Sequence, residues 1–143
     1  MTAQAVRQPV RARSWLRGGL VFLIVVQAVV GGWQYFFSRS FYDHFPTVAL
    51  DPPFNQHLMS DVGGLGLALT AVLVFAAVHL EYRLVCAALT GYIVYAATHV
   101  LFHLTHLDGF STAEAVENLV LLVGDVVIPV LLLVLARRAL GRR

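Results

Sequence analysis

The chain has 143 residues, of which 59% are hydrophobic and 13% are charged, and its mean hydropathy is +0.76. An ordinary soluble domain carries about 25% charged residues, so this composition excludes one, and the length allows a single domain over residues 1–143. All the basic residues behind the net charge of +2 are arginines, and their placement indicates topology and not binding to nucleic acid. The chain has a single cysteine, Cys86, which excludes an intramolecular disulfide.

Four apolar stretches are long enough to cross the hydrocarbon core of a bilayer, at about 18–37, 58–80, 84–105 and 116–136. The sequence therefore predicts an all-α fold, a transmembrane four-helix bundle. Residues 38–50 are expected to form the one sizeable loop. Asp51 followed by two prolines predicts the start of the second helix, and the run from Ser111 to Glu114 matches a capping box at the start of the fourth.

The arginines lie almost entirely on one side of these spans. Four precede the first span, one separates the second from the third, and four follow the last, which leaves only Arg39 on the other side. Cytoplasmic loops of membrane proteins carry the excess of Lys and Arg. We therefore expect the N-terminus and the C-terminus to be cytoplasmic.

Most acidic residues and most histidines lie on the opposite side. At 100° per residue, His99, His103 and His106 fall within about 60° of one another, and Tyr92 and Tyr95 continue the same stripe. An ionisable group facing lipid near the bilayer centre costs roughly 2.5–3.5 kcal/mol, so polar stripes are expected to face one another. The predicted chamber is walled by His57, Asp61, His99, His103, Glu117 and Asp125.

Imidazole and carboxylate groups from neighbouring helices are ligands typical of zinc, manganese, non-haem iron and copper. We expect His57, Asp61, His99 and His103 to bind a divalent or transition metal ion. Haem is less favoured, because its propionates need basic partners on a side where only Arg39 is available. One form of this prediction is a small metalloenzyme that acts on a lipid or quinone, with Glu117 or Asp125 as the catalytic base.

Two alternatives remain open. In the first, the protein is a non-catalytic accessory or scaffold protein whose polar groups hold the helices together. In the second, it is a homodimeric proton-coupled transporter that uses Glu117 and Asp125. The sequence does not decide whether the protein is an enzyme. Gln27, Gln34 and Asn118 are predicted to make hydrogen bonds between helices.

Three segments carry a resemblance to a known family: residues 40–46, 53–63 and 99–108. They resemble those of a family of small four-span actinobacterial membrane proteins, and the resemblance covers most of the chain outside the termini. It implies a bacterial plasma membrane. The topology predicted from the arginines then places the polar site of this multi-pass protein on the extracytoplasmic side. The resemblance implies no particular activity.

Overall fold

The computed structural model describes residues 3–50 and 53–141, with side chains from Val10 onward. Every regular element in these residues is helical. They are, in chain order, α1 (Ala3–Phe36), α2 (Ser38–His44), the short 3-10 helix η1 (Val48–Leu50), α3 (Gln56–His79), α4 (Tyr82–Thr105) and α5 (Thr112–Leu140). Helices α3, α4 and α5 and the Val10–Phe36 part of α1 are long and apolar enough to cross a membrane. The predicted all-α fold, with four helices long and apolar enough to span a membrane, is confirmed for this part of the chain.

The helix ends agree with the sequence at α5 and differ at α3. Ser111 accepts a hydrogen bond from the Glu114 backbone N–H, and the Glu114 carboxylate accepts one from the Ser111 backbone N–H at 2.9 Å, which completes the predicted capping box. Helix α3 begins at Gln56 and not at the prolines, because the Asn55 side chain accepts from Leu58 N at 3.1 Å and so caps the first turn. Asp51 and Pro52 lie outside the described residues.

The segment predicted as a loop at residues 38–50 instead contains α2 and η1. Aromatic packing accounts for the difference. Phe41 is buried, meets the Trp33 ring edge-on at 5.5 Å between centroids, and stacks on Phe45 at 4.6 Å. These contacts hold a short helix against the end of α1, which the polar composition of the segment did not indicate.

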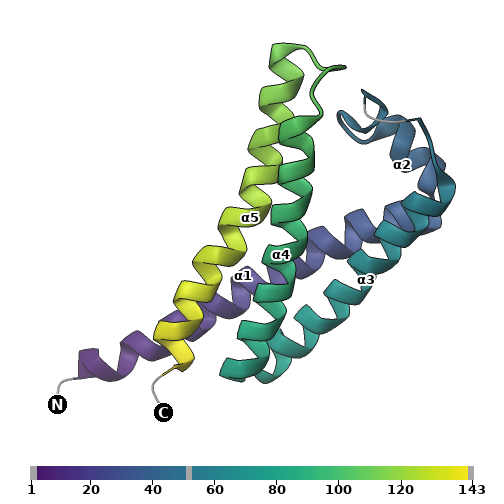
Figure 1. Ribbon diagram of the computed structural model, residues 1–143. Helices are drawn as coiled ribbons and strands as arrows, with labels where there is room; N and C mark the ends of the chain where they lie inside the picture. Colours follow the sequence, from purple (N-terminus) through teal and green to yellow (C-terminus); the bar gives the residue numbers. More distant parts are fainter. Residues whose placement is uncertain (1–2, 51–52, 142–143) are drawn as a thin grey trace.

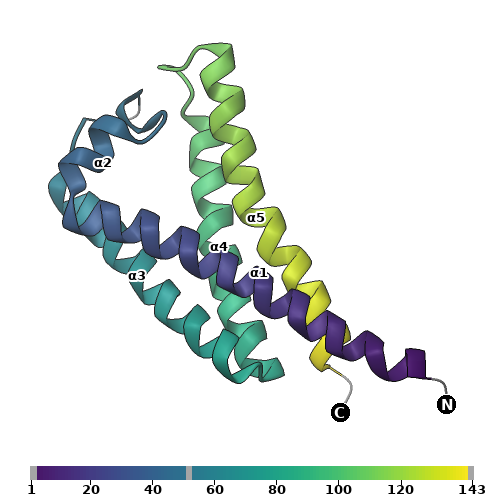
Figure 2. The same cartoon turned by 180° about the vertical axis from the view of Figure 1, so that it is seen from behind.

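The four long helices form two pairs. Helix α1 runs beside α3, and α4 runs beside α5 (Figures 1 and 2). The pairs come together toward the end where the C-terminal end of α5 and the turn between α3 and α4 lie, which we call the terminal end, and the first turns of α1 extend past α5 there (Figures 1 and 2). They diverge at the opposite end, which we call the loop end because α2, η1 and the loop between α4 and α5 lie there.

Most of the buried apolar side chains lie toward the terminal end, where the pairs meet. The largest fully buried side chains include Leu16, Leu20 and Leu23 of α1, Leu73 of α3 and Leu89 of α4. Because the helices diverge beyond this cluster, side chains nearer the loop end have fewer apolar neighbours. Most of the acidic residues and histidines that the structure describes lie in that half.

Glycines bring α1 and α3 together at backbone distance. A methyl group placed on Gly63 would lie 2.6 Å from Tyr35 N and 2.9 Å from Gly31 O, and one on Gly31 would lie 3.2 Å from Gly66 Cα. Real Cβ atoms essentially never approach other atoms as closely as 2.6 Å, so Gly63 has no room for a side chain, and Gly31 has room only if α3 shifts by a few tenths of an ångström. The α1–α3 pair is therefore packed backbone against backbone at the point where the polar half begins.

Candidate functional site

A hydrogen-bonded group of three side chains, which we call the polar junction, connects three helices. The Tyr92 hydroxyl donates to Asp125 Oδ1 at 2.6 Å and lies 3.2 Å from Gln27 Oε1. Tyr92 is fully buried, Gln27 is 5% exposed, and Asp125 is partly buried. A hydroxyl group has one proton, so Tyr92 shares it between two acceptors and directs it mainly to the nearer carboxylate.

The polar junction lies near the middle of its helices. Gln27 belongs to α1, Tyr92 to α4 and Asp125 to α5. The fourth long helix, α3, has a glycine beside the Gln27 amide and so leaves room for it. A methyl group on Gly66 of α3 would approach Gln27 Nε2 to 2.7 Å, so the amide would have to shift if this residue had a side chain. The four long helices are thus linked in series, from Gly66 through Gln27 and Tyr92 to Asp125.

From the polar junction, a row of rings follows α4 to the loop end. The Tyr95 and His99 rings lie 6.2 Å apart between centroids and nearly parallel, and the His99 and His103 rings lie 4.7 Å apart and edge-on. Residues separated by three or four positions share one helix face. The predicted polar stripe on this helix is therefore present, and its rings are close enough to follow one another without a break.

The row ends at a second polar contact, between α4, α5 and the segment after α2. The Asn118 amide nitrogen lies 3.4 Å from His103 Nδ1. The Thr47 hydroxyl, which contacts the Pro46 carbonyl oxygen at 2.6 Å, also reaches Asn118 Oδ1 at 3.1 Å. Asn118 is 7% exposed, so these bonds satisfy an otherwise buried amide. Gln27 and Asn118 both make the interhelical hydrogen bonds that the sequence predicts.

The six residues of the predicted chamber are not brought into one group. His57 and Asp61 pair with each other at 3.4 Å on an exposed face of α3, whose N-terminal end diverges from α4 (Figure 1). Glu117 and His99 are exposed, and only Asp125 is in the polar junction.

The described side chains do not bring together a complete set of metal ligands. Within the described residues, no three His, Cys, Asp or Glu side chains lie close enough to hold a metal ion. A catalytic zinc site uses three protein ligands, which the His99–His103 pair alone does not supply. Metal binding by His57, Asp61, His99 and His103 stays a prediction, and no catalytic step is derived through it.

One charged pair outside the spans lies within α2, and its arginine also contacts a ring just before α3. Arg39 Nε donates to Asp43 Oδ2 at 2.8 Å, and the hydrogen bond and charge of this carboxylate raise the pKa of Arg39. The Arg39 guanidinium also lies 5.2 Å from the centre of the Phe54 ring. Both charged side chains are exposed, so the pair orients the segment more than it stabilises the fold.

Two members of these contacts were not predicted as site residues. Thr47 lies in the segment expected to be a loop, and no pattern in the sequence marks it as a partner of Asn118. Tyr92 was part of the polar stripe, seven residues before His99, and that spacing places it on the same face. Its pairing with Asp125 depends on how α4 and α5 are aligned, which the sequence pattern does not state.

Comparison with known proteins gives no relative of this chain. No family model matches it, and neither a curated protein nor a solved structure matches it. Function is therefore inferred from the placement of the side chains alone.

Proposed function

We propose that the protein is a proton-coupled transporter in which the carboxyl group of Asp125 takes up and releases the proton. The observation that carries this proposal is the 2.6 Å hydrogen bond from the Tyr92 hydroxyl to Asp125 near the middle of two spans. A charged group is costly among apolar side chains unless it is hydrogen-bonded. Ionisable side chains at this depth line proton and ion pathways in membrane proteins.

The row of rings on α4 is the proton route in this proposal. Tyr95, His99 and His103 lead from the polar junction toward the loop end at centroid separations of 6.2 Å and 4.7 Å. A neutral imidazole accepts a proton on one nitrogen and donates from the other, and water bridges groups that do not touch. The relay runs from the loop end to Asp125.

The proposal includes an orientation and a location. Nine of the ten arginines flank the terminal end of the spans in the sequence, so that end lies in the cytoplasm and the loop end faces outward. The family resemblance supports a bacterial plasma membrane. Protons then enter from the extracytoplasmic side, where most of the acidic residues and histidines are found.

The transporter acts as a homodimer in this proposal. Leu121 lies one turn before Asp125 on the same face of α5 and is 54% exposed. Asp125 is only partly buried on the same helix. A second copy packed in this region would close the open side of the path, which the four helices of one chain leave uncovered.

Proton flux into proteoliposomes tests the proposal directly. With a trapped pH-sensitive dye and an imposed membrane potential, the wild-type protein should acidify the lumen, Asp125→Asn should abolish the flux, and Tyr92→Phe should slow it. Asp61→Asn is the matched control, because it neutralises an exposed carboxylate with the same change of atoms. Equal flux through wild-type protein and Asp125→Asn would contradict the proposal.

Infrared spectroscopy tests the proton step without a transported substrate. The difference spectrum between mildly acidic and mildly alkaline buffer should contain the carbonyl band of a protonated carboxylic acid. The band should be missing in Asp125→Asn and present in Asp61→Asn. If the band is unchanged in Asp125→Asn while the variant remains folded, the polar junction serves only to lock the helices, as in the scaffold alternative.

Metal binding is the second candidate, and the edge-on pair of His99 and His103 favours it. Two imidazoles four residues apart on one helix can share one ion, with the remaining ligands supplied by the second copy. Elemental analysis of protein purified without chelator checks this. We expect near-stoichiometric metal that is lost in the double variant His99→Ala and His103→Ala, and a metal-free wild-type protein that does not reload would contradict it.

A further inference from the structure

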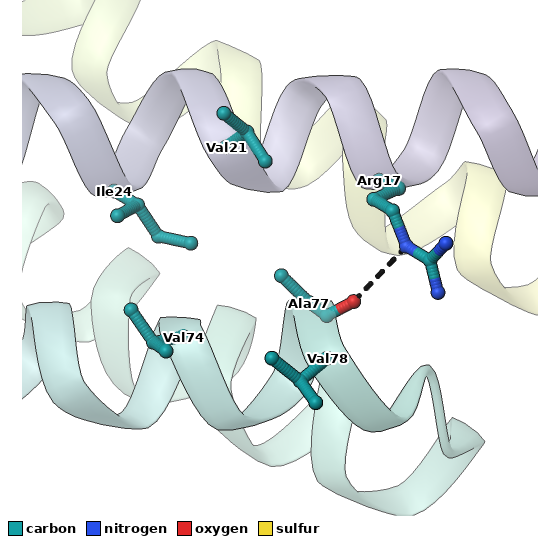
Figure 3. Close-up of a pocket in the computed structure, with 6 residues that line it drawn as sticks. All are labelled: Arg17, Val21, Ile24, Val74, Ala77 and Val78. Carbon is teal, nitrogen blue, oxygen red and sulfur yellow. Dashed lines mark hydrogen bonds between the residues drawn. The ribbon is translucent and has the colours of Figure 1, made fainter.

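An apolar groove lies between α1 and α3 near the terminal end of the molecule (Figure 3). Its volume is about 370 Å³, and it is open on one side. Ile24 of α1 and Val74 of α3 point toward one another across it. Its lining residues are Arg17, Val21, Ile24, Val74, Ala77 and Val78. All are aliphatic except Arg17, so the groove suits a hydrocarbon chain with a charged group at one end.

A second hollow of about 730 Å³ adjoins the first toward the start of α1. Arg17 and Val21 line both hollows. The second is more polar, because Arg13, Ser14 and His79 also line it. Among the residues described, no carboxylate lines either hollow. The two hollows therefore form one surface that is apolar toward the bilayer centre and basic toward the end of the span.

The Arg17 side chain is held where the two hollows meet. Its Nε donates to the Ala77 carbonyl oxygen at 3.2 Å (Figure 3). Ala77 is in the last turn of α3, where carbonyl groups lack partners within the helix and attract cations. A guanidinium has five N–H donors, so four remain, and Arg17 makes no other bond within the described side chains.

Arg13 adds a second positive charge beside the first. The two arginines are four residues apart on α1, so they lie on one face and repel each other. Glu81, in the turn that follows α3, makes no ion pair with either of them in the described part of the chain. An anion placed between the two guanidinium groups would remove the repulsion. The ammonium group of a zwitterionic lipid would find no partner there.

We propose that this surface binds an anionic phospholipid from the leaflet at the terminal end. Its acyl chain lies in the groove between Ile24 and Val74, and Arg13 and Arg17 hold its phosphate. Guanidinium groups match phosphate oxygens with paired N–H donors, and long basic side chains reach the interface from the edge of a span. The site is separate from the polar junction and does not depend on proton transport.

Native mass spectrometry with dioleoyl phosphatidylglycerol and dioleoyl phosphatidylcholine tests the proposal. Wild-type protein should retain phosphatidylglycerol in preference to phosphatidylcholine. Each lost arginine should lower phosphatidylglycerol binding about fivefold, so the double variant Arg13→Gln and Arg17→Gln should lose the preference. The double variant Arg11→Gln and Arg138→Gln removes the same charge from exposed positions that line neither hollow, and it should bind as wild-type protein does.

Two further variants keep the test decisive. Arg13 makes no described hydrogen bond, so Arg13→Gln alone should fold normally and still lose about fivefold in phosphatidylglycerol binding. Val74→Trp fills the groove without changing charge and should also weaken retention of phosphatidylglycerol. The proposal is overturned if the groove variants bind like the Arg11 and Arg138 control, or if wild-type protein does not distinguish the two lipids.

Discussion

The Thr47 hydroxyl reaches Asn118 Oδ1 at 3.1 Å and so links the segment after α2 to α5, and it also contacts the Pro46 carbonyl oxygen at 2.6 Å. Thr47 has a positive φ of 69°, in the left-handed region that β-branched residues rarely adopt. The backbone is therefore strained at Thr47, in the segment that connects the two diverging helix pairs. Strained positions persist when surrounding contacts fix them, and the bond to Asn118 is such a contact.

Substitutions at Thr47 should separate the strain from the hydrogen bond. Thr47→Ala loses the bond and keeps the strain, so the free energy of unfolding should fall by about 1 kcal/mol. Thr47→Gly also loses the bond, but glycine adopts the left-handed backbone without the cost of about 1 kcal/mol that other residues have there. It should therefore lower the free energy of unfolding less than Thr47→Ala does. Thermal unfolding in detergent micelles measures both. If the glycine variant is less stable than the alanine variant, the backbone at Thr47 is not strained.

The bond between Tyr92 and Asp125 should show a measurable coupling energy. Tyr92→Phe removes the only described donor to the carboxylate and should lower the free energy of unfolding by about 1–3 kcal/mol. A double-mutant cycle with Asp125→Asn should give a coupling of about 0.5–2 kcal/mol, measured by denaturation in mixed micelles. Tyr82→Phe, at an exposed tyrosine, is the control and should change little. Additive effects of the two substitutions would rule out the bond.

Adjacent glycines of α3 should respond in opposite ways to alanine. Gly63→Ala places a methyl group 2.6 Å from Tyr35 N, so α1 and α3 must separate, and we expect a loss of about 1–3 kcal/mol. At Gly64 the nearest atom to the new methyl group is 3.8 Å away, an ordinary contact, so alanine should gain up to about 1 kcal/mol from helix propensity. Melting temperatures of the two variants check the prediction. Equal effects would show that the backbones do not touch.

The two capped helix starts should each depend on one side chain. Asn55→Ala and Ser111→Ala remove the acceptors of the first turns of α3 and α5, and each should cost about 1 kcal/mol. Ser111→Asp keeps an acceptor and should retain most of the stability. Amide hydrogen exchange at Leu58 and Glu114 reports each cap separately. Unchanged exchange in the alanine variants would mean that the caps do not hold these turns.

The spans could be predicted from sequence because each depends only on its own composition. A run such as 116–136 is apolar whatever surrounds it, and the capping box at Ser111 is equally local. The faces of helices could be predicted for the same reason. His99 and His103 share the face that carries Tyr92, and Gln27 and Asn118 make the interhelical bonds expected of them.

The alignment of helices could not be predicted, because it depends on contacts between distant segments. His57 and Asp61 share one face of α3, but the close packing of Gly63 against α1 directs that helix away from α4 at the loop end. The helix at Ser38–His44 depends on Trp33 and Phe45 packing around Phe41. The sequence pattern of a single segment predicts neither the direction of α3 relative to α4 nor the packing around Phe41.

The turn between α3 and α4 has a consequence for how the chain enters a membrane. Only Leu80 and Glu81 separate the two helices, and Leu80 adopts a left-handed backbone that reverses the chain at once. A linker this short cannot cross a bilayer or let one helix insert long before the other. The two helices must enter together as a hairpin. A substitution that changes the charge at Glu81 or Arg83 would therefore change the topology of both helices and not of one.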